Sequence, residues 1–443
     1  MGSSTIVEET AKEQIKDDIS DQQIDLDKLA QLKAKAKQQE GKMAKIIAKK
    51  DRSLNFGVVG TGQCGSRIAE AFYKLGYEAV VINTAVQDLK YIEVPDSNKL
   101  LLEYGVGGAS KELSIGRDAA EKHVGLIQQL VSEKLSTSQV NVLCTSLGGG
   151  SGAGSVPVLI DVLNATGNPL VVIAALPMDS EDAQTKQNAL ETLAELAQAT
   201  QSKKIQNLIV VDNAKIEAIY HDVSQMEFFN VANKSIVNIL DVFNTYSMLP
   251  SAIKGIDPME WSKILIDSEG LTVYGELTVD NYTEDTAIAE AVVSNLNNNL
   301  LASEFDLKES KYVGVIIAAS KEVWAKIPSV AVNYAMSMVQ DATGTPRGVF
   351  KGIYSIQTDD DSVKVYSIFS GLGLPKERVE VLKKDAKQKM DAVKVKDENR
   401  NLSLNLDTGV NKTVSNVDKI KEKIASKASA FGKFTSTVVD RRK

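Results

Sequence analysis

The sequence lacks a disulfide framework and any long apolar segment. It holds only two cysteines, Cys64 and Cys144, so a disulfide-stapled secreted domain is excluded and a reducing, cytoplasmic location is expected. No run approaches about 18 uninterrupted apolar residues, and the N-terminus has no apolar signal core. We therefore expect neither membrane insertion nor secretion, and no membrane partner.

The sequence as a whole has no excess of positive charge. Its net charge of −7 argues against nucleic-acid binding over the whole surface, and we expect no direct sequence-specific DNA binding. The tail differs, since residues 411–443 carry nine Lys and Arg against three Asp and Glu, a balance of +6. Such a tail is either a solvated, disordered terminus or a docking arm for an acidic partner.

The sequence does have the pattern of an α/β protein. With 443 residues and 43% hydrophobic content, the chain can form two or three domains. Strand-like runs at 56–60, 79–83, 140–145, 169–176 and 207–212 alternate with helical stretches at 66–76, 116–134, 152–165 and 182–200. These β-α-β units predict a parallel sheet with its ligand at the carboxyl ends of the strands.

A second set of elements follows. A long helix is expected from about 225 to 246, with an apolar stripe best explained as core. Strand-like runs at 271–277, 312–319, 349–355 and 363–369 then enclose helical stretches at 284–300 and 330–341, and Pro375 opens a charged helix. We expect a smaller α+β unit here.

Two glycine loops are the main clue to function. Gly-Thr-Gly-Gln-Cys-Gly occupies residues 60–65, and Gly-Gly-Gly-Ser-Gly-Ala-Gly occupies residues 148–154. Glycines let the backbone turn its N–H groups toward one point, and a following helix adds the positive end of its dipole. Two such loops suggest a polyphosphate held from both sides.

The first loop alone fits a dinucleotide-dependent oxidoreductase. It matches G-x-G-x-x-G after a strand, but the second strand ends in Asn83-Thr84-Ala85 and offers no acidic residue for a ribose. A Walker loop fails too, because neither glycine run ends in Gly-Lys-Ser/Thr. The oxidoreductase remains a remote alternative.

The second loop resembles the signature of the tubulin/FtsZ superfamily, GGGTG followed by a small residue and Gly, with Ser151 in place of Thr. The resemblance extends through Gly62-Gln63-Cys64-Gly65, the loop at 105–109 and the Asp-Asn-Ala-Lys run at 212–215, and covers roughly residues 55–374. The helical N-terminal extension, the loop at 176–179 and the run at 365–376 before a long helix and basic tail are most similar to the TubZ group of plasmid- and phage-borne bacterial tubulins. Chromosomal FtsZ is less similar, since its short C-terminal peptide is not evident.

The resemblance implies a GTPase domain of tubulin/FtsZ type, a long central helix, a smaller α+β domain and a C-terminal helix with a tail. We place their limits as follows: helical N-terminal extension 1–52, GTP-binding domain 53–224, central helix 225–252, activation domain 253–374, C-terminal helix 375–410 and basic tail 411–443.

The implied ligands are GTP or GDP with Mg²⁺. Phosphates would lie against Gly62, Gln63 and Cys64 and against Gly148, Gly149, Gly150, Ser151 and Gly152, with the 105–109 loop, including Gly107, Gly108 and Ala109, sensing the γ-phosphate. The resemblance also implies that Asn83 and Thr84 are nucleotide-binding residues. Asn213 and Asn233 would hydrogen-bond guanine, Phe229 could stack on it or simply pack in the core, and Glu181 would contact the ribose.

Asp257 and Glu260 match the acidic pair that, in this superfamily, reaches the nucleotide of the next subunit. Three residues apart on a turn, their carboxylates can face one side and polarise a water, although they could also be solvated carboxylates beginning a helix. Pro258 lies between the two acidic residues, where a proline is unusual. His123 and His221 show no partner spacing, so no protein metal site is expected.

The expected function is therefore a GTP-hydrolysing protein that polymerises head to tail into filaments, with hydrolysis activated by assembly. Its expected task is partition or positioning of plasmid or phage DNA, through a DNA-binding adaptor that the basic tail recruits. A phage-spindle or cell-division tubulin homologue is the alternative.

Overall fold

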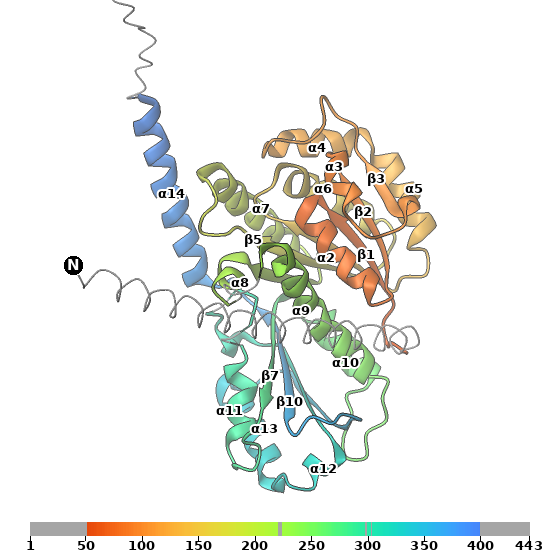
Figure 1. Ribbon diagram of the computed structural model, residues 1–443, viewed down its shortest axis with the longest axis vertical. Coiled ribbons are helices and arrows are strands. Elements are labelled where there is room, and N and C mark those ends of the chain that lie inside the picture. Colours follow the sequence, from red (N-terminus) through yellow and green to blue (C-terminus); the bar gives the residue numbers. More distant parts are fainter. Residues whose placement is uncertain (1–50, 220–223, 297–298, 303, 399–443) are drawn as a thin grey trace, which may run out of the picture. The chain divides into compact units, whose positions relative to one another are not determined.

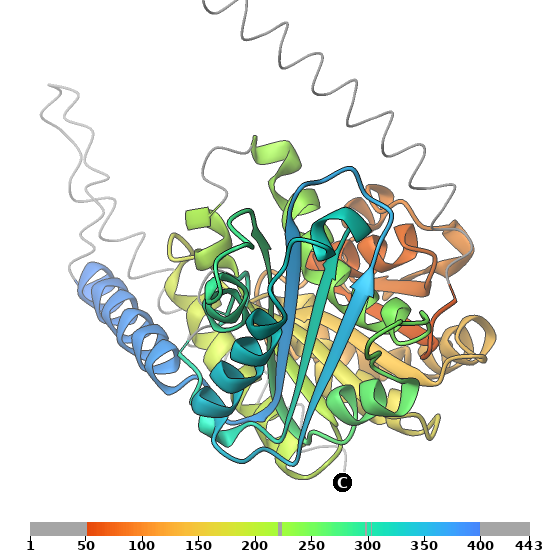
Figure 2. The same ribbon diagram turned by 90° about the horizontal axis from the view of Figure 1, so that it is seen from below.

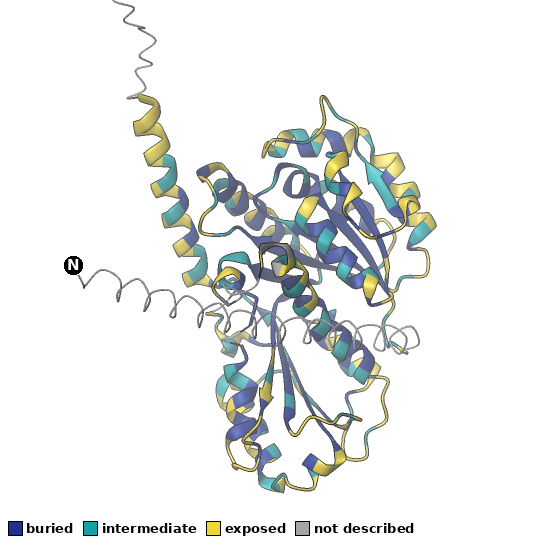
Figure 3. Ribbon diagram, viewed as in Figure 1, coloured by how far each residue is buried: buried dark blue, intermediate teal, exposed yellow. Residues whose placement is uncertain are grey.

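The computed structural model describes residues 51–219, 224–296, 299–302 and 304–398. The predicted N-terminal extension up to residue 50, the basic tail and His221 lie outside these residues. One ten-stranded sheet runs through the described chain in the order β3-β2-β1-β4-β5-β6-β7-β10-β8-β9 (Figures 1 and 2). Most of its strands are buried, whereas the helices around it expose their outer faces (Figure 3).

The first six strands are all parallel, as expected from repeated β-α-β units. Continuous apolar runs form most of them, which is typical of parallel strands covered on both faces. The strands are β1 (Phe56–Thr61), β2 (Glu78–Asn83), β3 (Lys99–Leu101), β4 (Val140–Ser146), β5 (Leu170–Leu176) and β6 (Asn207–Asp212). The helices between them are α2 (Gly62–Lys74), α3 (Val86–Lys90), α4 (Leu113–Lys122), α5 (Val124–Lys134), α6 (Gly150–Asn164), α7 (Ala183–Gln201) and α8 (Asn213–Ile219).

The remaining strands extend the same sheet with mixed direction. β7 (Gly270–Val279) pairs in parallel with β6, β10 (Val363–Leu372) lies antiparallel between β7 and β8 (Tyr312–Ala319), and β9 (Gly348–Ser355) pairs in parallel with β8. The helices of this part are α9 (Gln225–Tyr246), α10 (Pro258–Leu265), α11 (Ala287–Ser294), α12 (Lys321–Trp324), α13 (Ser329–Thr343) and α14 (Lys376–Glu398).

Every predicted strand is present, but several details of the pattern differ. The central helix ends at Tyr246 rather than at residue 252, and the predicted helical stretch at 284–300 contains a shorter helix, Ala287–Ser294. The three-residue strand β3 was not predicted, because it is too short to show an alternation and its residues are only half-buried. The helical stretch at 116–134 is two helices, α4 and α5, which part at His123. The His123 backbone leaves the helical region, and its Nδ1 lies 2.8 Å from the Ala119 carbonyl oxygen.

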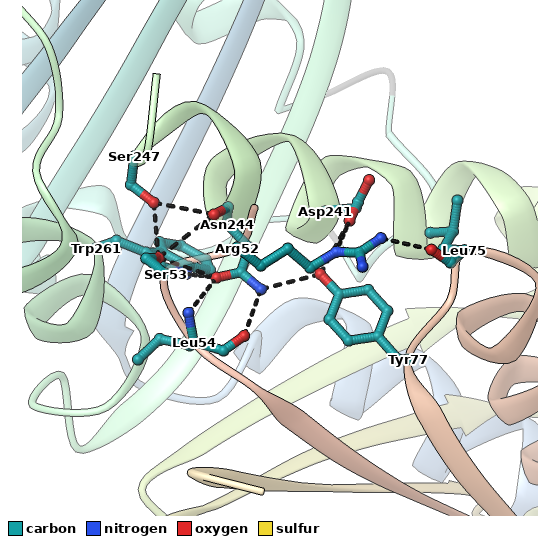
Figure 4. A network of polar contacts seen from close by, with 9 residues as sticks. All are labelled: Arg52, Ser53, Leu54, Leu75, Tyr77, Asp241, Asn244, Ser247 and Trp261. Carbon is teal, nitrogen blue, oxygen red and sulfur yellow. Dashed lines mark hydrogen bonds and ion pairs between the residues drawn. The ribbon is translucent and has the colours of Figure 1, made fainter. Parts of the chain in front are cut away.

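The central helix α9 is fixed to the start of β1 by a buried polar network (Figure 4). Asp241 of α9 accepts hydrogen bonds from Arg52 Nε at 2.7 Å and from the Tyr77 hydroxyl at 3.0 Å. The Arg52 guanidinium also lies 4.0 Å from the centre of the Tyr77 ring. Burial raises the pKa of Tyr77 well above its usual value, so its hydroxyl remains a donor.

The same network continues one turn along α9. Asn244 pairs with the Leu54 backbone, with its amide nitrogen donating to Leu54 O and its oxygen accepting from Leu54 N, both at 2.8 Å. Its oxygen also accepts from Trp261 Nε1 of α10 at 3.2 Å. One amide therefore joins β1, α9 and α10 without leaving its buried donors and acceptors unpaired.

We predict that Asp241→Leu lowers the free energy of unfolding by about 3–5 kcal/mol, because it leaves the largely buried Arg52 without its carboxylate. Adding Arg52→Met should recover most of that loss, since two apolar side chains need no ion pair. Lys204→Ala, which breaks the exposed pair with Asp161, is the control and should cost less than about 1 kcal/mol. Urea unfolding measures all three; equal losses in the single and double variants would contradict the prediction.

Candidate functional site

The two glycine loops meet at the carboxyl ends of neighbouring strands. β1 and β4 pair in parallel, so the loops that follow them emerge side by side. Gly62 has a φ of +68°, and a Cβ placed on it would lie 2.9 Å from Gly152 Cα. Glycine is therefore required at Gly62 for both its backbone conformation and the close approach of the second loop.

Both loops present free backbone donors. Helix α2 begins at Gly62 and α6 begins at Gly150; neither N-cap residue makes a side-chain cap, and neither first turn contains an acidic residue. The Thr61 hydroxyl, which could have capped α2, is paired with the Ser155 hydroxyl at 2.7 Å. Two positive helix ends with unpaired N–H groups therefore converge, an arrangement that favours an anion.

Backbone also packs tightly behind the loops. A side chain on Gly65 would collide with the Cys144 carbonyl, and one on Gly150 would meet Ala109. Burial raises the pKa of the Cys64 thiol to about 12, so the thiol is protonated at neutral pH. Cys64 is therefore a small neutral side chain in a confined place, as the sequence indicated.

A cavity of about 320 Å³ opens above the loops, within the size range of small-ligand sites. Most of the predicted binding residues line it: Gly62, Gln63, Cys64, Asn83, Gly148, Gly149, Gly150, Ser151, Gly152, Glu181, Asn213, Phe229 and Asn233. Residues that sequence reasoning missed also line it, among them Arg67, Asp88, Lys111, Ser146 and Thr185.

Four predicted binding residues do not line the cavity. Thr84, Gly107, Gly108 and Ala109 are not part of the cavity wall. The Thr84 hydroxyl is 2.5 Å from the Ser151 hydroxyl, and the Gly108 amide donates to the Thr84 carbonyl at 2.9 Å. Thr84 therefore supports the wall through Ser151, and Gly108 holds the Thr84 backbone, whereas Gly107 is exposed.

The loop after β3 brings Lys111 to the cavity wall beside the second glycine loop. Gly105, Gly107, Gly108, Ser110 and Lys111 all have positive φ, an unfavourable conformation for the last two. Asn188 holds this loop against the second glycine loop by donating to the carbonyls of Lys111 and Gly148, at 2.7 and 3.2 Å. Lys111 forms an ion pair with Asp182, and this contact lowers the pKa of the Asp182 carboxyl to about 2.

Another part of the cavity wall is formed by amide side chains and an aromatic ring. Asn213 begins α8, and Phe229 and Asn233 lie one turn apart on α9. The Arg67 guanidinium lies 5.1 Å from the centre of the Phe229 ring. Such a combination of planar stacking surface and amide hydrogen-bonding groups suits a nucleobase.

Glu181 and Asn83 hold their own loops. Glu181 Oε2 accepts from the Met178 amide at 2.9 Å, and Asn83 Nδ2 donates to Asp88 at 3.0 Å while its oxygen accepts from the Ala85 amide at 3.2 Å. Both residues nevertheless reach the cavity wall. They can therefore combine loop positioning with ligand contact.

Asp257 and Glu260 lie away from this cavity. Asp257 is the N-cap of α10 and accepts from the Glu260 amide at 2.8 Å, while Glu260 Oε2 accepts from the Asp257 amide at 3.0 Å. Pro258 occupies the first helical position, where its missing N–H costs nothing. The proline that was unexpected in the sequence is thus a helix-start residue.

No helix in the described ranges is long and apolar enough to cross a membrane. Within those ranges, no group of three or more His, Cys, Asp or Glu side chains is arranged to hold a metal ion.

Comparisons with known proteins agree with this geometry. Residues 55–221 match the Tubulin/FtsZ family GTPase domain, and residues 242–383 match the C-terminal domain of TubZ-like Tubulin/FtsZ-like proteins. The tubulin-like protein CetZ of Pyrococcus furiosus is 25% identical over 80% of this chain and 95% of its own length. The tubulin-like protein TubZ of Bacillus cereus is 23% identical over 82% of this chain and 90% of its own length.

Solved structures show the same fold. A GTPγS-form protofilament of TubZ from Bacillus thuringiensis serovar israelensis superposes with a TM-score of 0.69 at 18% identity, covering 79% of this chain and 96% of that one. A GTPγS-bound protofilament of CetZ2 from Haloferax volcanii gives a TM-score of 0.62 at 21% identity, covering 77% and 100%. The chain belongs to the tubulin/FtsZ superfamily, with a GTPase domain followed by a TubZ-like C-terminal domain.

Proposed function

We propose that the protein binds GTP in the cavity above the glycine loops and hydrolyses it within head-to-tail filaments. The observation that carries the proposal is the meeting of two uncapped helix N-termini at Gly62 and Gly150, in a domain that matches GTPases. The phosphates would accept hydrogen bonds from these backbone amides, with Lys111 on the same side.

The guanine would lie against the amide side chains and the aromatic ring of the cavity wall. Asn213 and Asn233 offer amide donors and acceptors for its edge, and Phe229 offers a ring face. Mg²⁺ would be held largely by phosphate oxygens and water and would neutralise charge on the β- and γ-phosphates. The chain's own residues orient the phosphates and keep the base in place.

Asp257 and Glu260 would act on the nucleotide of the adjacent subunit. Neither residue lines the nucleotide cavity of its own subunit. The segment around them exposes the apolar side chains of Met248, Leu249, Ile253 and Met259. A group of exposed apolar side chains marks a protein contact surface. Bringing this surface over a neighbour's cavity would place the two carboxylates beside the γ-phosphate, where they can polarise an attacking water.

The cellular task would be partition or positioning of plasmid or phage DNA in the cytoplasm. The TubZ-like C-terminal domain supports this assignment, because one protein of similar structure is a type III plasmid segregation TubZ. The basic tail at 411–443 would recruit a DNA-binding adaptor, with the filament supplying movement. A phage-spindle or cell-division role remains the alternative for the same polymer chemistry.

We predict that Glu260→Gln leaves GTP binding intact and slows hydrolysis in assembled protein by about 100-fold or more, giving long-lived filaments. Glutamine keeps an oxygen that can accept the cap hydrogen bond from Asp257, so α10 should still form. Glu290→Gln, in the exposed first turn of α11, is the matched control. Phosphate release and light scattering measure both; a normal hydrolysis rate in Glu260→Gln would refute the role.

We predict that Asn233→Ala weakens GTP binding by about 1–3 kcal/mol, because a buried hydrogen bond to the base edge is lost. Asn230→Ala, one turn earlier on the same helix and exposed to solvent, should leave the affinity unchanged. Calorimetric titration of GTP and ATP tests the assignment. Equal affinity of the unaltered protein for the two nucleotides would show that the base is not read here.

Deletion of residues 411–443 should preserve GTPase activity and assembly but abolish capture of adaptor–DNA complexes by filaments. The reason is loss of the +6 segment, whose attraction to an acidic surface would weaken with salt over a screening length of about 8 Å. Cosedimentation at two salt concentrations measures it. Undiminished capture would mean that the tail is a solvated terminus, and failure to polymerise would place it in the filament contact.

A further inference from the structure

The C-terminal helix α14 contacts the elements that form one side of the nucleotide cavity. It runs alongside α7 and α8 (Figure 1), although it follows the last strand of the sheet and belongs to the other end of the sequence. Three of its side chains, Arg378, Asp385 and Lys389, reach residues at the ends of β5 and β6 or in α7. Nothing in the GTPase fold by itself requires these contacts.

Arg378 of α14 forms an ion pair with Asp212, the last residue of β6. Its Nε and Nη2 donate to both carboxylate oxygens of Asp212, at 2.5 and 3.0 Å, and the Asp212 side chain is only 4% exposed. Asp212 also accepts from the Ala214 amide at 3.3 Å. Asn213, which lines the cavity, lies between these two residues. The guanidinium therefore fixes the turn that presents Asn213.

Two lysines hold the loop that follows β5. Lys389 of α14 donates to the carbonyls of Asp179 and Glu181, at 2.5 and 2.7 Å. Lys186 of α7 donates to the same Asp179 carbonyl at 2.8 Å. Pro177, Met178 and Glu181 of this loop line the cavity, so the position of α14 sets the position of part of the wall.

A buried ion pair joins α14 to α7. The Lys186 side chain is 1% exposed and forms an ion pair with Asp385 of α14. A buried ammonium without a carboxylate is strongly unfavourable. Asp385 therefore supplies the carboxylate that this ammonium needs, and the pair fixes the position of α14 against α7 and the neighbouring cavity wall.

We propose that α14 is part of the nucleotide site, with Arg378 and Lys389 as positioning residues that hold Asn213 and the Glu181 loop in the binding conformation. The inference rests on the proposed binding of GTP in this cavity. Coupling between two binding events is reciprocal. Nucleotide binding therefore strengthens the docking of α14, and a partner that pulls α14 away weakens nucleotide binding by the same factor.

The test compares Arg378→Met, Arg378→Lys and Lys383→Met in the full-length chain, at concentrations below assembly. Lys383 is the matched control, since it lies on the same helix and, among the residues that the structure describes, forms its ion pair with Glu380 alone, at 2.7 Å and one turn away. Arg378→Met should weaken GTP and GDP binding equally, by about tenfold. Equal weakening is expected because the contacts described for Arg378 and Lys389 are with Asp212, Asp179 and Glu181 and not with either glycine loop. Arg378→Lys should recover part of the affinity, and Lys383→Met should bind normally.

Hydrogen exchange supplies the readout that a merely structural role would not change. GTP should protect residues 376–393 in the unaltered protein, and Arg378→Met should raise exchange in residues 177–181 and 213–216. A lower melting temperature with unchanged nucleotide affinity would overturn the inference. If the unaltered protein fails to bind GTP, the proposed function fails instead. If Arg378→Met does not fold, Lys389→Met, which keeps the Arg378–Asp212 pair, replaces it, and normal nucleotide affinity there would overturn the inference.

Discussion

The close approach of Gly62 to Gly152 is the constraint on which the site depends. It requires β1 and β4 to be neighbours in one parallel sheet, and that pairing requires the β-α-β order of the first half. The helix ends then converge without any side chain between them. A phosphate site built in this way needs few charged residues, which explains how an acidic chain can bind an anion.

Much of this could be predicted from the sequence, because the relevant signals are local. Long apolar runs marked the strands, and the order of the glycine loops indicated the superfamily. The start of α10 was also readable, since Asp257, Pro258 and Glu260 form an N-cap, a proline at the first helical position and a capping box. The alternative that Asp257 and Glu260 begin a helix is confirmed, and their catalytic role stays a prediction.

The missed features depend on long-range packing. Lys111 lines the cavity because Asn188, 77 residues further along, holds its carbonyl. Arg378 meets Asp212 across 166 residues, and Lys389 meets Glu181 across 208. No sequence periodicity or motif predicts such pairs. By contrast, the short strand β3 and the break at His123 were missed because each involves only one to three residues.

The capping box at the start of α10 has an effect beyond the helix it begins. Two reciprocal hydrogen bonds fix Asp257 and Glu260 in each isolated subunit, so neither carboxylate has to be ordered when another molecule arrives. The entropy of that ordering is lost once, during folding. An approaching surface therefore meets carboxylates that are already ordered, with the Lys254 ammonium 3.6 Å from Glu260, and the contact loses little side-chain entropy at this point.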